Sequence, residues 1–200
     1  MLTCYHEAGH AVIAWLGGAT VTEIAVDGGY GYTLITDVFE LPPALRVKIG
    51  LAGWCAENRS RYGSASALEL EKALNWAGRD IDGWIVENGL RALRGDKWAT
   101  GYRLLDEVNS ELQAHWPVVR QIAGALQRKR ILEIGDPDMQ PLRKTPPIAG
   151  RPATVRELNT LAATAEQGGN PAMAALLRST VVRMESRQKP QAKRERAVKD

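Results

Sequence analysis

The opening segment, residues 5–16, constrains the fold of this chain more than any other stretch. It has the sequence YHEAGHAVIAWL and contains the pattern His-Glu-x-x-His with no interrupting proline. Its alanine, isoleucine and leucine residues favour a helix, and residues four apart on a helix share a face. His6 and His10 can therefore present two imidazole nitrogens to one divalent cation, which is half of a zinc site. Glu7 would lie beside the metal, where its carboxylate could take a proton from a water molecule.

The same three side chains have a second interpretation, as histidines that are merely packed in a core. On an ordinary surface helix they would stand among polar neighbours, but here the flanking residues are small and apolar. Burial of a glutamate and two histidines in such surroundings costs free energy unless they are paired or have a function. The context therefore favours a metal site over a packed core, with Glu7 as a general base.

Length and composition are those of a folded domain with an extension. Two hundred residues, 44% of them hydrophobic, are enough for a real core. The two cysteines, Cys4 and Cys55, form no Cys-x-x-Cys pair, which indicates a reducing, cytoplasmic setting rather than a disulfide framework. No apolar run is long enough to cross a bilayer and no leader-like pattern opens the chain, so we expect no membrane segment.

The C-terminal part of the chain differs in composition from the rest. We expect a Pro-rich linker over residues 139–153, a short helical extension over 154–186 and a basic, disordered tail over 187–200. Residues 151–200 carry ten Lys and Arg against five Asp and Glu, whereas the remainder is slightly acidic. No aromatic residue is interleaved with the basic run and no recognition motif accompanies it, so we do not expect a nucleic-acid partner.

The pattern after the opening helix predicts a hairpin and then several helices. Paired glycines should end the first helix near residue 17. Alternating β-branched residues over 20–26 and 30–36 flank the turn Asp27-Gly28-Gly29, which predicts a hairpin. Apolar periodicity predicts helices over residues 44–58, 67–77, 83–99 and 112–134. The predicted fold is therefore mainly α with a small β-hairpin or sheet (α+β), with the His-Glu-x-x-His helix packed against further helices.

Two features of the predicted elements bear on the site. The small residues Gly50, Ala52 and Gly53 would let the helix of residues 44–58 approach the histidine helix closely. Glu57, near the end of that helix, could hold one metal-bound imidazole. A strand beside a metal also matters, because a peptide can add itself to a sheet edge by main-chain hydrogen bonds.

The third metal ligand is expected to be a carboxylate. The only other histidine, His115, lies far along the chain before a Trp-Pro break, which makes it a poor candidate. The available acids follow the predicted hairpin and second helix; they are Glu69, Glu71, Asp80 and Asp82. Periodicity does not choose among them, and each is equally compatible with a solvated helix face.

The order of these motifs resembles the peptidase domain of FtsH-type ATP-dependent zinc metalloproteases. The likeness rests on four successive features: His-Glu-Ala-Gly-His, a hairpin ending in Gly31-Tyr32-Thr33, the segment Leu-Ala-Gly-Trp-Cys-Ala-Glu ending at Glu57, and an acid-led helix from Glu69. The leucine-rich stretch 112–134 is similar to the closing helix of that domain. The likeness covers about residues 3 to 138, so we assign residues 1–138 to an FtsH-like zinc peptidase domain.

The resemblance implies a role for each matching residue. His6 and His10 would bind zinc, and Glu7 would activate the water. The family's third ligand is an Asp that opens a later helix, four residues before an Ala, and Glu69 holds that place here; Glu71 is the second choice and Asp80 the third. We expect Gly31, Tyr32 and Thr33 to bind substrate.

The implied activity is zinc-dependent hydrolysis of peptide bonds in unfolded or flexible polypeptides. The sequence contains no Gly-x-x-x-x-Gly-Lys-Ser/Thr phosphate loop, although the family couples its peptidase to an ATPase. This leaves open whether the chain acts alone, as a homo-oligomer or with a separate ATPase. The alternative is a non-catalytic, FtsH-peptidase-like interaction module that acts through its helical extension and basic tail.

Overall fold

The computed structural model describes residues 1–63, 68–76 and 80–143, together with isolated positions between 159 and 182. The chain divides into two compact units, Met1–Pro152 and Ala153–Asp200. Residues 144–153 of the predicted linker, most of the predicted helical extension and the predicted tail lie outside the described residues. The first unit is α+β, mostly helical with a small antiparallel sheet, and the rest of this section concerns that unit.

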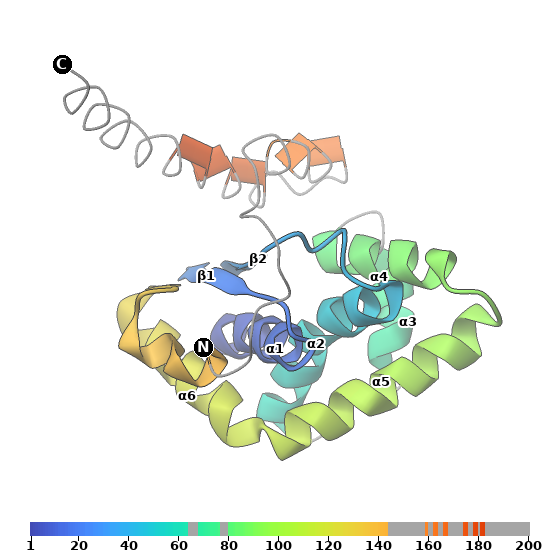
Figure 1. The fold of residues 1–200 in the computed structure, drawn as a ribbon, viewed down its shortest axis with the longest axis horizontal. Helices are drawn as coiled ribbons and strands as arrows, with labels where there is room; N and C mark the ends of the chain where they lie inside the picture. Colours follow the sequence, from blue (N-terminus) through green and yellow to red (C-terminus); the bar gives the residue numbers. More distant parts are fainter. Residues whose placement is uncertain are drawn as a thin grey trace. The chain divides into compact units, whose positions relative to one another are not determined.

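Two helices pack against each other at the centre of the first unit. They are α1, Leu2–Leu16, and α2, Pro43–Tyr62 (Figure 1). A Cβ at Gly9 would lie 2.5 Å from the carbonyl oxygen of Ala52, so the two backbones nearly touch. This confirms the close approach that the small residues of α2 predict. Helix α1 also ends next to Gly17, as predicted.

A three-stranded antiparallel sheet lies over α1 (Figure 1). Its strands are β1, Val21–Asp27, β2, Tyr30–Ile35, and β3, Ile131–Glu133, in the order β2-β1-β3. The predicted hairpin is confirmed, with Ala25 opposite Tyr32 and a tight turn at Gly28, whose φ is 58°. Strand β2 is an edge strand of the described sheet and lies next to α1.

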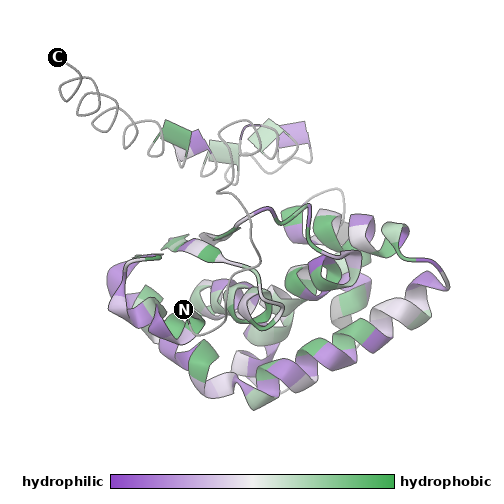
Figure 2. Cartoon of the chain, in the orientation of Figure 1, coloured by the Kyte–Doolittle hydropathy of each residue, from purple (hydrophilic) through white to green (hydrophobic). Residues whose placement is uncertain are grey.

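The remaining helices surround this centre. They are α3, Leu68–Trp76, α4, Ile81–Ala92, α5, Lys97–Ala114, and α6, Trp116–Lys129, followed by the 3-10 helix η1, Pro137–Arg143. Figure 2 shows hydrophilic and hydrophobic residues alternating along α5, as expected of a helix with one buried face. The buried face of α5 consists of Leu104, Leu105, Val108 and Leu112.

Two predicted helices are wrong in their bounds. The helix predicted over 83–99 is in fact two, because Gly95 has a φ of 117° and Asp96 caps the start of α5 by accepting a hydrogen bond from the amide of Ala99. The helix predicted over 112–134 breaks at His115, and its last residues form β3 instead, where Leu132 pairs with Ile24 of β1.

The end of the first unit lies beyond the predicted domain boundary at residue 138. That boundary falls inside η1, whose Met139 is only 1% exposed and belongs to the hydrophobic core. The unit therefore includes part of the stretch predicted as linker. Within the described ranges, no helix is both long and apolar enough to cross a membrane.

Candidate metal centre

Helix α1 presents His6 and His10 on one face, as the four-residue spacing requires. Their ring centroids are 4.7 Å apart and the rings are inclined at 77°. Asp82, in the first turn of α4, faces both rings: its Oδ2 is 2.9 Å from Nε2 of His6 and 3.3 Å from Nε2 of His10. Within the described part of the chain, this is the group of His, Cys, Asp or Glu whose ligand atoms converge within 4.8 Å.

One separation among these three atoms suits a tetrahedral cation. Ligands bound to zinc at about 2.0–2.1 Å lie about 3.3 Å from one another. The 3.3 Å between His10 and Asp82 matches that value, whereas the 2.9 Å between His6 and Asp82 is a hydrogen-bond distance. Two imidazoles with one carboxylate are a ligand set that zinc accepts in catalytic sites. The residues present could therefore hold a zinc ion.

The other nitrogen of each imidazole has a partner that fixes the ring. His10 Nδ1 lies 2.7 Å from the carbonyl oxygen of Ile49, and because a carbonyl only accepts, Nδ1 carries the proton. His6 Nδ1 lies 3.6 Å from Oε2 of Glu57, the residue expected to hold one imidazole. With Nδ1 engaged in both rings, the two Nε2 atoms are turned toward Asp82.

The charges of the group are strongly coupled. Burial would raise the pKa of the Asp82 carboxyl, but the two imidazoles outweigh it and hold that pKa well below its usual range. Burial lowers the pKa of His6, yet its hydrogen bond to Asp82 and the nearby Glu57 carboxylate prevail and raise the pKa well above 6.5. The pKa of His10 is raised as well, because the Asp82 charge outweighs its burial. The negative charge of Asp82 therefore stabilises positive charge on the two neighbouring imidazoles.

Gly53 lets α2 pass close to the two imidazoles. A Cβ at this position would lie 2.5 Å from Nε2 of His6 and closer still to Nε2 of His10. A side chain of any kind at residue 53 would therefore push both rings out of their present positions beside Asp82.

Glu7 lies next to His6 in α1 and is 5% exposed. Its Oε2 accepts a hydrogen bond of 2.9 Å from the hydroxyl of Thr33, and a Cβ at Gly31 would lie 2.6 Å from its Oε1. Burial raises the pKa of Glu7, and the neighbouring imidazoles lower it again only in part. A buried carboxylate with a raised pKa is suited to taking up and releasing a proton near neutral pH.

The residues predicted to bind substrate lie on both faces of β2. Gly31 and Thr33 share the face toward α1 and contact Glu7, because alternate residues of a strand point to the same side. Tyr32 points the other way, is buried and donates a hydrogen bond to Glu23 of β1.

The structure brings Asp82 to the imidazoles, an acid that the sequence analysis named without ranking. The side chain of Glu69 lies outside the described residues, and Glu71 is exposed on α3. Asp80 caps α4, accepting hydrogen bonds from the amides of Asp82 and Gly83, and its burial beside Asp82 raises its pKa to about 6. The sequence contains one signal that could have pointed to Asp82. It is the helix start Asp-Ile-Asp-Gly, in which an N-cap Asp is followed two residues later by a second Asp in the first turn.

Comparison with known proteins does not identify a family for this chain. No family model matches the chain, and no curated protein matches it.

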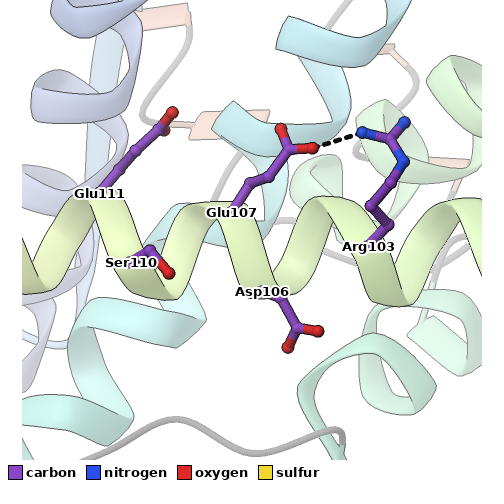
Figure 3. A pocket seen from close by; sticks show the side chains of 5 residues that line it. All are labelled: Arg103, Asp106, Glu107, Ser110 and Glu111. Carbon is purple, nitrogen blue, oxygen red and sulfur yellow. Dashed lines mark hydrogen bonds and ion pairs between the residues drawn. The ribbon is translucent and has the colours of Figure 1, made fainter.

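A shallow, open depression on α5 is another feature with clustered charges. It is lined by five side chains of that helix, of which Glu107, Glu111 and Arg103 point to one side and Asp106 to the other (Figure 3). Lys48 of α2 lies 2.5 Å from Glu111 and 3.7 Å from Glu107. Glu107 and Glu111 therefore connect α5 to α2 by ion pairs with Lys48, and neither belongs to the imidazole–carboxylate group.

Proposed function

We propose that this protein is a zinc-dependent metallopeptidase whose metal ligands are His6, His10 and Asp82. The observation that carries the proposal is the convergence of two Nε2 atoms and one carboxylate oxygen within 4.8 Å of one another. Asp82 replaces Glu69 as our choice of third ligand. The His-Glu-Ala-Gly-His motif and the resemblance to FtsH-type peptidases support the same activity.

In the proposed reaction, separate residues of the chain carry the proton and orient the metal ligands. Zinc, when bound, supplies a Lewis acid that polarises the scissile carbonyl and lowers the pKa of water. Glu7 accepts the proton of the attacking water and passes it to the leaving amine. Ile49 and Glu57 keep the imidazoles oriented through their Nδ1 atoms, which fixes the direction of both Nε2 lone pairs.

The proposed substrate is an unfolded or flexible polypeptide. Strand β2 is an edge of the described sheet and carries Gly31 and Thr33 next to Glu7, so a peptide added along it would run past the metal site. Main-chain pairing of this kind selects an extended conformation rather than a side chain. A separate ATPase that unfolds substrates, or assembly of several copies, is compatible with this proposal.

The test is the substitution Glu7→Gln in the full chain. We expect about one zinc per chain in both proteins, and hydrolysis of casein that falls at least 100-fold in the variant, because the base is lost while the ligands remain. Glu71→Gln, an exposed acid of α3, is the matched control and should retain activity. Zinc bound by the wild-type protein with no hydrolysis of any unfolded substrate would contradict the proposal and favour a non-catalytic module.

A further inference from the structure

The carboxylate of Glu7 is held by strand β2 rather than by its own helix. The hydroxyl of Thr33 donates to Oε2 at 2.9 Å, and the absence of a side chain at Gly31 leaves room for Oε1. Residues 31 and 33 lie on the same face of β2, so a single strand provides both the donor and the space. Hydrogen bonds between the strand and β1 in turn fix its position over α1, with Thr33 paired to Ile24.

A glutamate that acts as a base needs this kind of support. Its side chain has several rotatable bonds, and a displacement of about 1 Å in a reacting group can cost about 100-fold in rate. The hydroxyl of Thr33 also lies 3.0 Å from the main-chain oxygen of Glu7, so it contacts both the main chain and the carboxylate of that residue. The Thr33 hydroxyl can therefore donate to this main-chain oxygen instead when Glu7 is protonated.

We propose that Thr33 is the positioning residue for Glu7: the hydrogen bond from its hydroxyl to Oε2 fixes the orientation of the carboxylate. This inference rests on the proposed function. It gives Thr33 a role different from substrate contact, because the side chain faces α1 whereas a peptide added to the edge of β2 would pair with the main chain. Threonine is suited to the task because its hydroxyl has one proton to donate and its branched side chain restricts χ1.

The experiment compares three variants of the zinc-loaded full chain on casein. Thr33→Val keeps the shape and removes the hydroxyl, and we expect kcat to fall about 10- to 100-fold with KM and zinc content unchanged. Thr33→Ser restores the hydroxyl and should bring kcat back to within about threefold of wild type. Thr22→Val is the matched control, since Thr22 of β1 donates to the carbonyl oxygen of Leu34 and not to Glu7, and it should leave kcat unchanged.

A second comparison separates positioning from general damage to the strand. In the Glu7→Gln background, adding Thr33→Val should lower the residual rate by less than twofold, because Thr33 acts through the carboxylate that is already gone. The inference is overturned if wild type is active and Thr33→Val matches it, if serine fails to rescue, or if the loss is the same size in both backgrounds. A zinc-loaded wild-type protein that hydrolyses nothing overturns the proposed function itself, and with it this role.

Discussion

Gly53 lets α2 pass close to the two imidazoles. Replacing it with alanine would place a methyl group 2.5 Å from Nε2 of His6, so both rings would have to move from their positions beside Asp82, while α2 keeps its helical conformation. We expect Gly53→Ala to bind less than a tenth as much zinc as the wild-type protein, measured by metal analysis after gel filtration. The control is Gly124→Ala in α6, where the nearest neighbour of the new methyl group is Arg128 at 3.6 Å. Full zinc content in Gly53→Ala would show that the metal does not bind between these nitrogens.

Sequence reasoning reached half of the proposed metal site at the scale of residues. The spacing of His6 and His10 places both rings on one face of a helix, because that relation is local. Asp82 lies 72 positions beyond His10, and only the packing of α4 on α2 brings it near. The resemblance implied an Asp that opens a later helix four residues before an Ala. Asp82 lies in the first turn of α4, but Val86 follows it four residues later, so that pattern did not select it. The predicted helix of residues 83–99 also began too late to include Asp82.

The start of α4 is the element that positions Asp82. Asp80 caps this helix, but burial and the charge of Asp82 raise its pKa to about 6 from an ordinary value of 3.8. An acid with a raised folded-state pKa destabilises the fold when ionised, and the cost disappears as pH falls through 6 toward 3.8. In metal-free protein we expect Asp80→Asn, which still caps, to raise the free energy of unfolding by about 1–2 kcal/mol at pH 8 and by about half of that at pH 5. Urea denaturation at the two pH values measures the difference, and an equal effect at both would contradict it.

Among the elements, sequence alone predicts those whose pattern is local. Helix α1 and the β1–β2 hairpin follow from apolar periodicity and a glycine turn. Strand β3 has only three residues and follows a helix directly, so it exists because Leu132 pairs with Ile24, more than a hundred positions earlier. The break between α4 and α5 depends on a left-handed glycine, Gly95, within an otherwise helical pattern.

On the scale of the whole chain, every residue of the proposed site lies in the first unit, Met1–Pro152. We therefore expect a chain ending at Pro152 to keep its zinc and its casein hydrolysis within about twofold of the full-length protein, since it retains the full hydrophobic core. The measurements are zinc content and kcat/KM on both chains. If removal of residues 153–200 abolishes the activity of a folded, zinc-loaded protein, the second unit contributes to catalysis or substrate binding.

A bound metal would add a connection between α1 and α4, which already meet through the contacts of His6 and His10 with Asp82. His6 and His10 come from α1 and Asp82 from α4, so an ion held by all three stabilises the folded first unit and not the unfolded chain. With free zinc at 100 times the dissociation constant, the gain is about 2.7 kcal/mol. For a protein of this size, that gain raises Tm by about 5–10 °C.

Thermal unfolding with and without a chelator measures this gain, and two variants locate it. Asp82→Asn should lose the shift because the third ligand is gone, whereas Glu69→Gln should keep it. The reverse result would return the third-ligand position to Glu69, as the resemblance first implied. Equal Tm values for the chelated and zinc-loaded wild-type protein would mean that the ion does not join α1 to α4 at all. The two imidazoles and the carboxylate would then be a buried charge network with no metal.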